Sequence, residues 1–303
     1  MKRVLVIGAS SFIGSQLCVT LRQFYSVHGT YAKHKPRIDG VPLVPLNLET
    51  NSPIDPIVLR LQPQTVIYCA GERDETKCES DPRQALFINA EAPSILAAAA
   101  AQSGGRFIYL STVKVFSGEH GDYSEQDEPN PISAYGKTKL GAESLLSHYE
   151  NTFILRLGSL YGISFLGADS VLQRLLHALW TGTETALILD EPRSFFSCDE
   201  LSRLIQIIIE ASNQVSGIYH ISNGDELSYF DFGKLVAKTF GISADIFKPI
   251  SGSEFQAKGF NQAQRGIKST LNGKHFSDTF SFQYQSTETC LDLLRRKLRD
   301  GKQ

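Results

Sequence analysis

The chain of 303 residues is long enough to bury a large core, and this length is typical of one large domain or two modest ones. Its 30 basic and 32 acidic residues give a formal charge of −2, with no run of like charges at either end. This balance argues against a nucleic-acid partner and against binding to an anionic membrane.

The five cysteines are widely separated, with no C-x-x-C pair and no histidine at metal-binding spacing: Cys18, Cys69, Cys78, Cys198 and Cys290. We expect reduced thiols in a cytoplasmic protein and no metal site. The first apolar run, residues 4–7, stops at Gly8 and is too short for a signal peptide, and no stretch is long enough to span a bilayer.

Short apolar runs then alternate with helical patterns, which is typical of βαβ units and a parallel sheet. The predicted strands are residues 4–7, 25–31, 41–46, 65–70, 106–110 and 152–157. The predicted helices are residues 15–24, residues 82–102 with a bend or break at Pro93, and a helix from Tyr135 to about Tyr149.

These elements predict an α/β fold with a doubly wound, parallel-sheet Rossmann domain over residues 1–160, joined by part of 190–223. Beyond Tyr161 the alternation loosens, so we predict a smaller, partly discontinuous α/β substrate-binding domain over residues 161–303. Within it, Ser228 and Asp231 match a capping box that opens a helix ending before Gly241.

The first strand runs into a glycine-bounded turn and then into a helix, so backbone N–H groups and the helix dipole point at the turn. We expect the turn to hold a pyrophosphate through Gly8, Ser10, Ser11, Phe12, Ile13 and Gly14. Ser11 replaces the middle glycine of the usual pattern. The alternative is an ordinary strand-turn-helix whose glycines allow tight packing.

The second strand lacks the acidic residue that usually binds the ribose 2′-hydroxyl of NAD, because no Asp or Glu occurs between Gly14 and Asp39. A basic cluster that contains Lys33 and His34 stands there instead. Such a cluster would neutralise a 2′-phosphate, so NADP(H) is favoured over NAD(H). The alternative is a solvated basic loop.

Tyr135 and Lys139 are four residues apart at the start of a helix, so both side chains project from one face. A neighbouring ammonium and a positively charged nicotinamide ring favour the phenolate, which makes Tyr135 a candidate acid and base. Ser111 and Thr112 end the strand before this helix, where ligands bind in parallel sheets. Side-chain chemistry alone leaves open which of the two hydroxyls would face a substrate.

Several ordered motifs resemble the extended branch of the short-chain dehydrogenase/reductase superfamily, most closely its dTDP-4-dehydrorhamnose reductase group of sugar-nucleotide reductases. These motifs are GASSFIG, CAGERDETKCESDP, Asn89, LSTVKVFSG, YGKTKLGAE, LRLGSLYG and GIYHISN. The resemblance covers nearly the whole chain and implies the same Rossmann fold and a nicotinamide cofactor.

The resemblance also implies roles for individual residues. Thr112 stands four residues before Phe116 and matches the catalytic hydroxyl, with Tyr135 and Lys139 as its partners. Further implied contacts are Asn47 and Leu48 with the adenine, Cys69, Ala70 and Gly71 with the cofactor cleft, and Arg193 and Arg265 with a nucleotide diphosphate. An isolated arginine is otherwise more often part of a surface ion pair.

Three positions depart from the reductase pattern. Ser159 replaces an aromatic residue that helps to hold the sugar, and Gly266 stands where proline is common. Glu72-Arg73 replaces a Tyr-Thr pair and resembles the methionine adenosyltransferase regulatory β subunit, a relative with a partner-binding role.

Val113 and Lys114 stand where sugar dehydratases usually carry Asp-Glu as acid and base, so elimination of water is disfavoured. A combined epimerase/reductase would need a cysteine near the same turn, and none lies there, so epimerisation beside the ketone is disfavoured as well. The reaction that is left needs only the transfer of a hydride and a proton, so we predict NADPH-dependent reduction of a 4-keto-6-deoxy sugar nucleotide. The alternatives are a cofactor-retaining NAD(P)-dependent sugar-nucleotide epimerase and a non-catalytic NADP-binding regulatory subunit. The sequence does not decide the oligomeric state, and a homodimer is one possible assembly.

Overall fold

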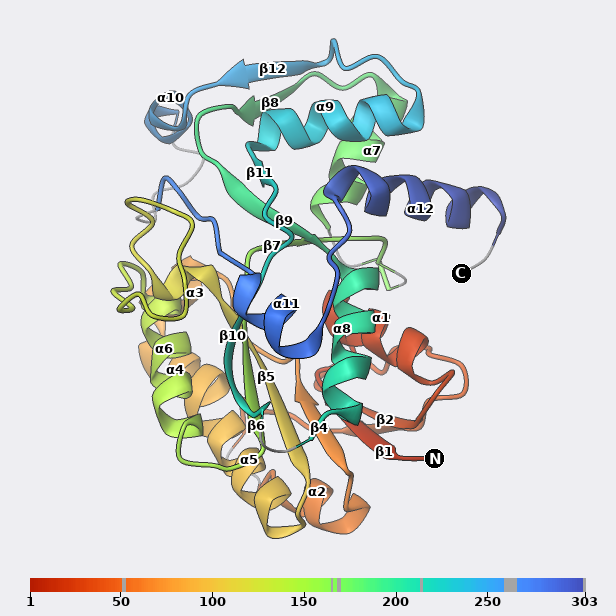
Figure 1. The fold of residues 1–303 in the computed structure, drawn as a ribbon, viewed down its shortest axis with the longest axis vertical. Coiled ribbons are helices and arrows are strands. Elements are labelled where there is room, and N and C mark those ends of the chain that lie inside the picture. The colour runs from red at the N-terminus through yellow and green to blue at the C-terminus, as the bar shows by residue number, and fades with distance from the viewer. Residues whose placement is uncertain (51–52, 165, 168–169, 213–214, 259–265, 302–303) are drawn as a thin grey trace.

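A seven-stranded parallel sheet forms the centre of the computed structural model, which describes residues 1–50, 53–164, 166–167, 170–212, 215–258 and 266–301 (Figure 1). The strand order is β10-β6-β5-β4-β1-β2-β3. These strands are β1 (Arg3–Ile7), β2 (Ser26–Tyr31), β3 (Leu43–Pro45), β4 (Thr65–Tyr68), β5 (Arg106–Thr112), β6 (Thr152–Leu157) and β10 (Gly217–Ile221). This sheet confirms the predicted doubly wound α/β fold.

Both faces of the sheet are covered, because side chains alternate along each strand. In β1, Val4 and Val6 pack into one core with α1 (Phe12–Leu21) and α8 (Cys198–Glu210). Leu5 and Ile7 pack into a second core on the opposite face. The helices near that second core are α2 (Pro56–Leu61), α3 (Glu75–Ser80), α4 (Pro82–Leu86), α5 (Ala92–Gln102) and α6 (Ala134–Leu146).

The strand order reverses between β1 and β4, which are hydrogen-bonded neighbours. In doubly wound sheets, ligands bind outside the carboxyl ends of the strands at such a switch point. The fold therefore places the Gly8 turn, the end of β4 and the end of β5 side by side at the carboxyl edge of the sheet.

The remaining strands form two small sheets, β11-β9-β7 and β12-β8, in the upper part of Figure 1. Their bounds are β7 (Ser159–Tyr161), β8 (Thr185–Ile188), β9 (Arg193–Ser197), β11 (Glu226–Leu227) and β12 (Phe247–Ile250). The helices of this half are α7 (Val171–Thr181), α9 (Tyr229–Phe240), α10 (Gly252–Ala257) and α12 (Thr287–Arg299). α11 (Lys274–Phe280) packs instead on β10 of the large sheet, through Phe276 and Phe280. β10 lies in the large sheet and falls within the 190–223 segment that was predicted to join residues 1–160. The division into two domains at residue 160 stays a prediction.

The predicted cap of α9 is present. Ser228 accepts a hydrogen bond from the Asp231 N–H at 3.0 Å, and its hydroxyl donates to the Asp231 carboxylate at 2.6 Å. Gly241 ends the helix with φ of +71°, a conformation that favours glycine.

The segment predicted as one helix over residues 82–102 is divided, but the division precedes Pro93. A π-helical turn (Phe87–Glu91) joins α4 to α5, and Pro93 lies in the first turn of α5. In this wider turn the N–H of Ala92 donates to the carbonyl of Phe87.

The π-helical turn releases two carbonyls for side chains of the sheet. The Ala92 N–H bypasses the carbonyl of Ile88, and Pro93 has no N–H to donate to Asn89. Tyr68 and Tyr109 instead donate their hydroxyls to these carbonyls, each at 2.6 Å. The turn is thus fixed to β4 and β5, and the Asn89 side chain has a defined place.

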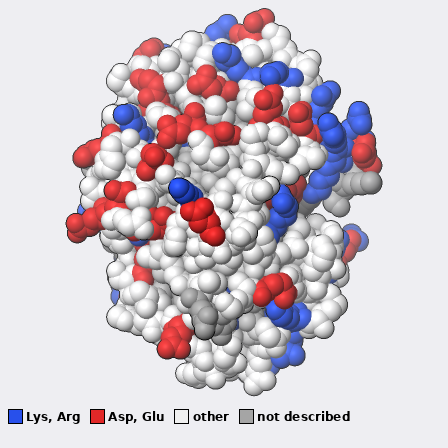
Figure 2. Space-filling view, in the orientation of Figure 1, with Lys and Arg blue, Asp and Glu red and all other residues white. Residues whose placement is uncertain are grey.

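The surface drawn in Figure 2 carries mixed charge, with acidic side chains across its upper half and the densest basic group at the right. On that side α12 carries Arg296, Lys297 and Arg299 in its last turn. In the part of the chain that the structure describes, no helix is both long and apolar enough to cross a membrane. All five cysteines are free thiols.

Candidate active site

The Gly8 turn is closely packed against the end of β4. Gly8 has φ of +87°, and a Cβ there would lie 2.8 Å from the backbone nitrogen of Ala70. A Cβ at Gly14 would collide with the carbonyl oxygen of Gly8. Ser11, at the position of the missing glycine, caps α1 by accepting the Gly14 N–H at 3.0 Å. The turn thus keeps an open helix N-terminus, which suits a pyrophosphate.

Adding a methyl group at Gly8 is expected to disrupt this turn, because the φ angle and the contact with Ala70 both disfavour a side chain. We expect Gly8→Ala to weaken NADPH binding by about 10-fold or more and to lower the free energy of unfolding by roughly 1–3 kcal/mol. Titration calorimetry and thermal unfolding measure the two effects.

The matched control is Gly141→Ala in the interior of α6, where the nearest atom to a new Cβ is 3.9 Å away. This change should leave NADPH binding unaltered and stabilise the helix by about 0.5–1 kcal/mol. Wild-type NADPH affinity in Gly8→Ala would contradict the role given to the turn.

Lys33, predicted to meet a 2′-phosphate, lies past the end of β2 and forms an ion pair with Glu49 at 2.9 Å. Both side chains are exposed, and His34 beside Lys33 is exposed as well. Sequence reasoning missed Glu49, because it compared only the residues between Gly14 and Asp39. An acidic side chain therefore does lie near the end of β2.

Asn47 and Leu48 follow β3 at the same edge of the sheet. The Asn47 carboxamide accepts the N–H of Glu49 at 2.9 Å, and the Leu48 carbonyl accepts from the Gln84 side chain at 3.1 Å. Leu48 itself is buried. These contacts fix the loop beside the Lys33 ion pair.

The loop after β4 contains Cys69, Ala70 and Gly71 and is held by Asn89 from the π-helical turn. Asn89 is fully buried, and its carboxamide accepts the N–H of Glu72 and donates to the carbonyl of Glu72, both at 2.9 Å. The same carboxamide donates to Thr138 in α6 at 3.0 Å. Asn89 thereby joins the loop after β4 to the helix that carries Tyr135 and Lys139.

The two hydroxyls at the end of β5 have different partners. Ser111 donates to the buried carboxylate of Glu143, whereas the Thr112 side chain is close enough to Tyr135 to lower its pKa. The Thr112 hydroxyl also accepts the N–H of Lys114 at 3.2 Å. The geometry therefore places Thr112, and not Ser111, beside Tyr135.

Tyr135 lies in the first turn of α6, which Ser133 caps by accepting the Gly136 N–H at 3.1 Å. Burial raises the pKa of Tyr135 to about 12, while the hydrogen bond from Thr112 and the charge of Arg73 act in the opposite direction. The sequence predicts that the Lys139 ammonium lowers the pKa of Tyr135. In the structure Lys139 is not among the groups that shift this pKa. Tyr135 therefore holds its proton at neutral pH.

Lys139 is buried one turn after Tyr135. Its ammonium donates to the carbonyl of Leu110 at 2.6 Å and lies 3.9 Å from the centroid of the Tyr109 ring. Burial lowers the pKa of Lys139 to about 7, and the nearby carboxylate of Glu143 opposes this effect.

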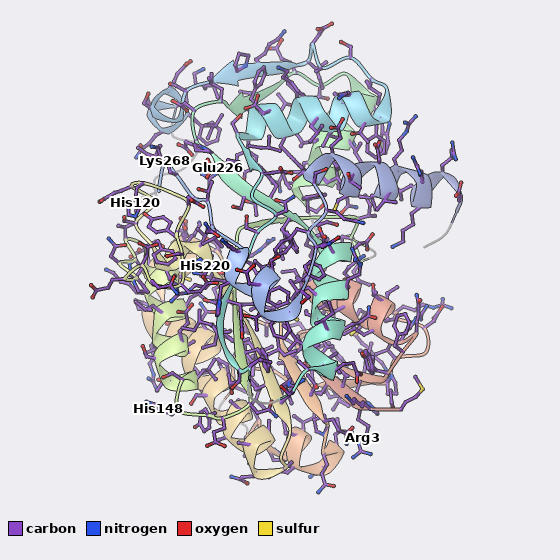
Figure 3. All side chains as sticks on the ribbon, in the orientation of Figure 1. Arg3, His120, His148, His220, Glu226 and Lys268 are labelled. Carbon is purple, nitrogen blue, oxygen red and sulfur yellow. The ribbon has the colours of Figure 1, made fainter. Side chains whose placement is uncertain are left out.

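A buried polar network behind Lys139 was not predicted from the sequence. Glu143 and Arg156 form an ion pair at 2.7 Å, and each side chain is only 3% exposed. Arg156 also contacts His220, since a guanidinium nitrogen lies 3.2 Å from the Nε2 of His220. The Nδ1 of His220 lies 2.7 Å from the carbonyl oxygen of Tyr123. Figure 3 labels His220, which comes from the carboxyl half of β10.

Burial lowers the pKa of His220 to about 4, so its ring is neutral at pH 7. The neutral ring donates through Nδ1 to the Tyr123 carbonyl and accepts at Nε2 from Arg156, which uses both nitrogens. The network thereby connects α6, β6, β10 and the loop before α6.

A cavity of 210 Å³ lies between the large sheet and the upper half of the molecule. The large-sheet side contributes Glu75, Lys114, Phe116, Ile132 and Ser133, and the other side contributes Ser159, Arg193, Tyr229, Gly266 and Ser269. Two residues that depart from the reductase pattern, Ser159 and Gly266, therefore line it. A Cβ at Gly266 would lie 2.6 Å from the carbonyl oxygen of Ser117, so close packing accounts for glycine there.

Arg193 is held in the cavity wall by Glu191, at 2.8 Å, and lies 5.3 Å from the centroid of the Tyr229 ring. Its Nε is buried and has no hydrogen-bond partner among the described residues. Arg265, the second arginine predicted to meet a substrate, lies outside the described residues. Within those residues, no group of three His, Cys, Asp or Glu side chains is placed to hold a metal ion.

A family model for the RmlD substrate binding domain matches residues 1–299. The chain belongs to this family. Its relatives include the "Probable low-salt glycan biosynthesis reductase Agl14" of Haloferax volcanii, 31% identical over 248 residues that cover 80% of this chain and 82% of that protein. The match confirms the resemblance to the extended short-chain dehydrogenase/reductase superfamily, and the chain is an NAD(P)-dependent oxidoreductase of that type.

Two further comparisons bear on the fold and on the alternatives. Methionine adenosyltransferase 2 subunit beta of Bos taurus is 26% identical over 83% of this chain and 76% of its own length. A dTDP-4-dehydrorhamnose reductase of Bacillus anthracis, solved in complex with NADP, superposes with a TM-score of 0.81 over 98% of this chain and 99% of that one. At 23% identity, this second likeness shows the fold.

Proposed function

We propose that this protein reduces the keto group of a sugar nucleotide with NADPH, and that a 4-keto-6-deoxy sugar nucleotide is its substrate. The observation that carries the proposal is the position of the Thr112 side chain beside Tyr135 at the carboxyl end of β5, with Lys139 one turn further along α6. The cavity lined by Lys114 and Ser133 offers a place for a sugar ring, and the Lys114 ammonium in its wall lies 5.9 Å from the centroid of the Tyr135 ring.

The glycine turn fits a dinucleotide, since Gly8 and Gly14 have no room for a Cβ. The residues proposed to hold the cofactor are Gly8, Ser10, Ser11, Phe12, Ile13 and Gly14 at the pyrophosphate, Lys33, His34, Asn47 and Leu48 at the adenosine, and Cys69, Ala70, Gly71, Tyr135 and Lys139 near the nicotinamide riboside. When bound, the nicotinamide supplies the hydride.

The protein's own residues would orient the carbonyl and supply the proton. When substrate is bound, the single O–H of Thr112 turns from Tyr135 to the carbonyl oxygen, and Tyr135, protonated at neutral pH, gives that oxygen its proton. Lys139, whose pKa of about 7 lies far below that of Tyr135, is charged for part of the time and holds ribose hydroxyls. Arg193 has a buried, unused Nε donor among the described residues that suits a diphosphate oxygen.

Cofactor preference depends on Lys33, whose charge is balanced by Glu49. We expect Lys33→Ala to raise the KM for NADPH about 5- to 10-fold and to leave the KM for NADH nearly unchanged, because only NADPH carries a 2′-phosphate. Glu49→Gln should act in the opposite direction and lower the KM for NADPH. Equal changes for both cofactors in Lys33→Ala would contradict this assignment.

The test of the proposed function is NADPH oxidation against a panel of dTDP- and UDP-linked 4-keto-6-deoxy sugars, followed by absorbance. Turnover of at least one of them, abolished by removal of the sugar nucleotide, is expected. Oxidation of none of them, with tight NADPH binding, would overturn the proposal.

A regulatory role is the second candidate, because several methionine adenosyltransferase β subunits are among the relatives and Glu72-Arg73 resembles them. In that case NADPH binds without turnover and a partner enzyme copurifies. Arg73 is exposed beside α3, so Arg73→Ala should then weaken the partner complex.

A further inference from the structure

Lys114 and Glu75 form an ion pair in the wall of the cavity, next to the proposed proton donor. The Lys114 ammonium lies 5.9 Å from the centroid of the Tyr135 ring. The Glu75 side chain is only 11% exposed, whereas Lys114 is 43% exposed and faces the open space. Neither residue has a role in the reaction described above.

The backbone fixes both partners relative to the reacting groups. The N–H of Lys114 donates to the Thr112 hydroxyl, and Lys114 lies in a single 3₁₀ turn (Val113–Val115). Glu75 begins α3, which Asp74 caps by accepting the Thr76 N–H at 3.0 Å. The backbone of both residues is therefore held near Thr112 and Tyr135, and the ion pair between their side chains lies beside these two groups.

An adjoining ammonium and carboxylate match a hydroxyl group, which can accept from the first and donate to the second. A methyl group can do neither and would cover both charges without replacing their water. In a 4-keto-6-deoxy sugar, one ring carbon next to the carbonyl carries a hydroxyl and the other carries a methyl group.

We infer that Lys114 and Glu75 form a specificity subsite that binds the hydroxyl on the ring carbon next to the reacting carbonyl. The inference rests on the proposed function, and it specifies which group of the substrate the Lys114–Glu75 pair recognises. The subsite favours sugars that keep this hydroxyl over sugars in which it is replaced by hydrogen.

The test compares wild type, Lys114→Met and Glu75→Gln, with Lys137→Met on the exposed side of α6 as the matched control. Binding of dTDP-glucose, UDP-glucose and their 3-deoxy analogues to the NADP⁺-loaded protein is measured by calorimetry, and the KM of any reduced ketone is measured in parallel. Thermal unfolding establishes that each variant is folded.

We expect Lys114→Met to weaken binding of the hydroxyl-bearing ligands by about 10-fold or more and to leave the 3-deoxy ligands unchanged. Glu75→Gln should shift binding in the same direction by less, and Lys137→Met should bind as wild type. If Lys114→Met discriminates between the two kinds of ligand as wild type does, the subsite is overturned and the proposed function stands. If wild type binds none of these sugar nucleotides, both fail.

Discussion

Replacing Tyr135 with phenylalanine is expected to lower kcat for ketone reduction by roughly 10²- to 10⁴-fold, the range that a positioned proton donor contributes. The hydroxyl is the only polar group of the Tyr135 side chain, and burial raises its pKa to about 12, so it keeps its proton at neutral pH. The ring itself remains, so NADPH affinity should change by less than about 3-fold. Single-turnover kinetics and NADPH titration measure the two effects.

The control for this experiment is Tyr149→Phe, just past the end of α6, where the hydroxyl lies 3.5 Å from that of Ser94. This change removes a hydroxyl at the opposite end of α6 from Tyr135, 14 residues further along the chain, so kcat should stay at the wild-type value. Unchanged turnover in Tyr135→Phe would refute the proton-transfer mechanism.

Removing the carboxylate of Glu143 is expected to cost about 3–5 kcal/mol of unfolding free energy, because Arg156 is then left buried without its counter-charge. Glu143 accepts three hydrogen bonds from Arg156 at 2.7–3.2 Å and one from Ser111. In the described structure, water has little access to replace them, since both charged side chains are 3% exposed. Denaturant unfolding of Glu143→Ala measures the loss.

The control is Glu254→Ala, which breaks the exposed pair with Lys258, at 3.0 Å on α10. Exposed helix pairs contribute about 0.5 kcal/mol or less, so this variant should unfold almost as wild type does. A loss of stability in Glu143→Ala no larger than that in Glu254→Ala would show that the buried network is not stabilising.

Local patterns in the sequence were sufficient for the fold class and for the Gly8 turn. Strand and helix periods, glycine spacing and caps are short-range signals, and the Ser228 cap is formed as expected. Boundaries were less accurate. β5 continues through Ser111 and Thr112, since both residues pair with β6, and α1 begins at Phe12 because Ser11 caps it.

Contacts between distant segments could not be read from the sequence. The choice between Ser111 and Thr112 depends on Glu143, which lies 32 residues after Ser111 and takes its hydroxyl. In the same way, Glu49 meets Lys33 only because β2 and β3 are neighbours in the sheet. Sequence spacing gives no measure of such charge pairing.

The most direct test of the central claim is deuterium transfer from NADPH that carries deuterium at both C4 positions of the nicotinamide, with a reduced sugar nucleotide analysed by mass spectrometry. A reductase that uses Thr112, Tyr135 and Lys139 should give a product that carries the label on the former carbonyl carbon, with one cofactor oxidised per product formed. An epimerase that retains its cofactor would give no net NADPH oxidation. Product that forms without the label would contradict the account.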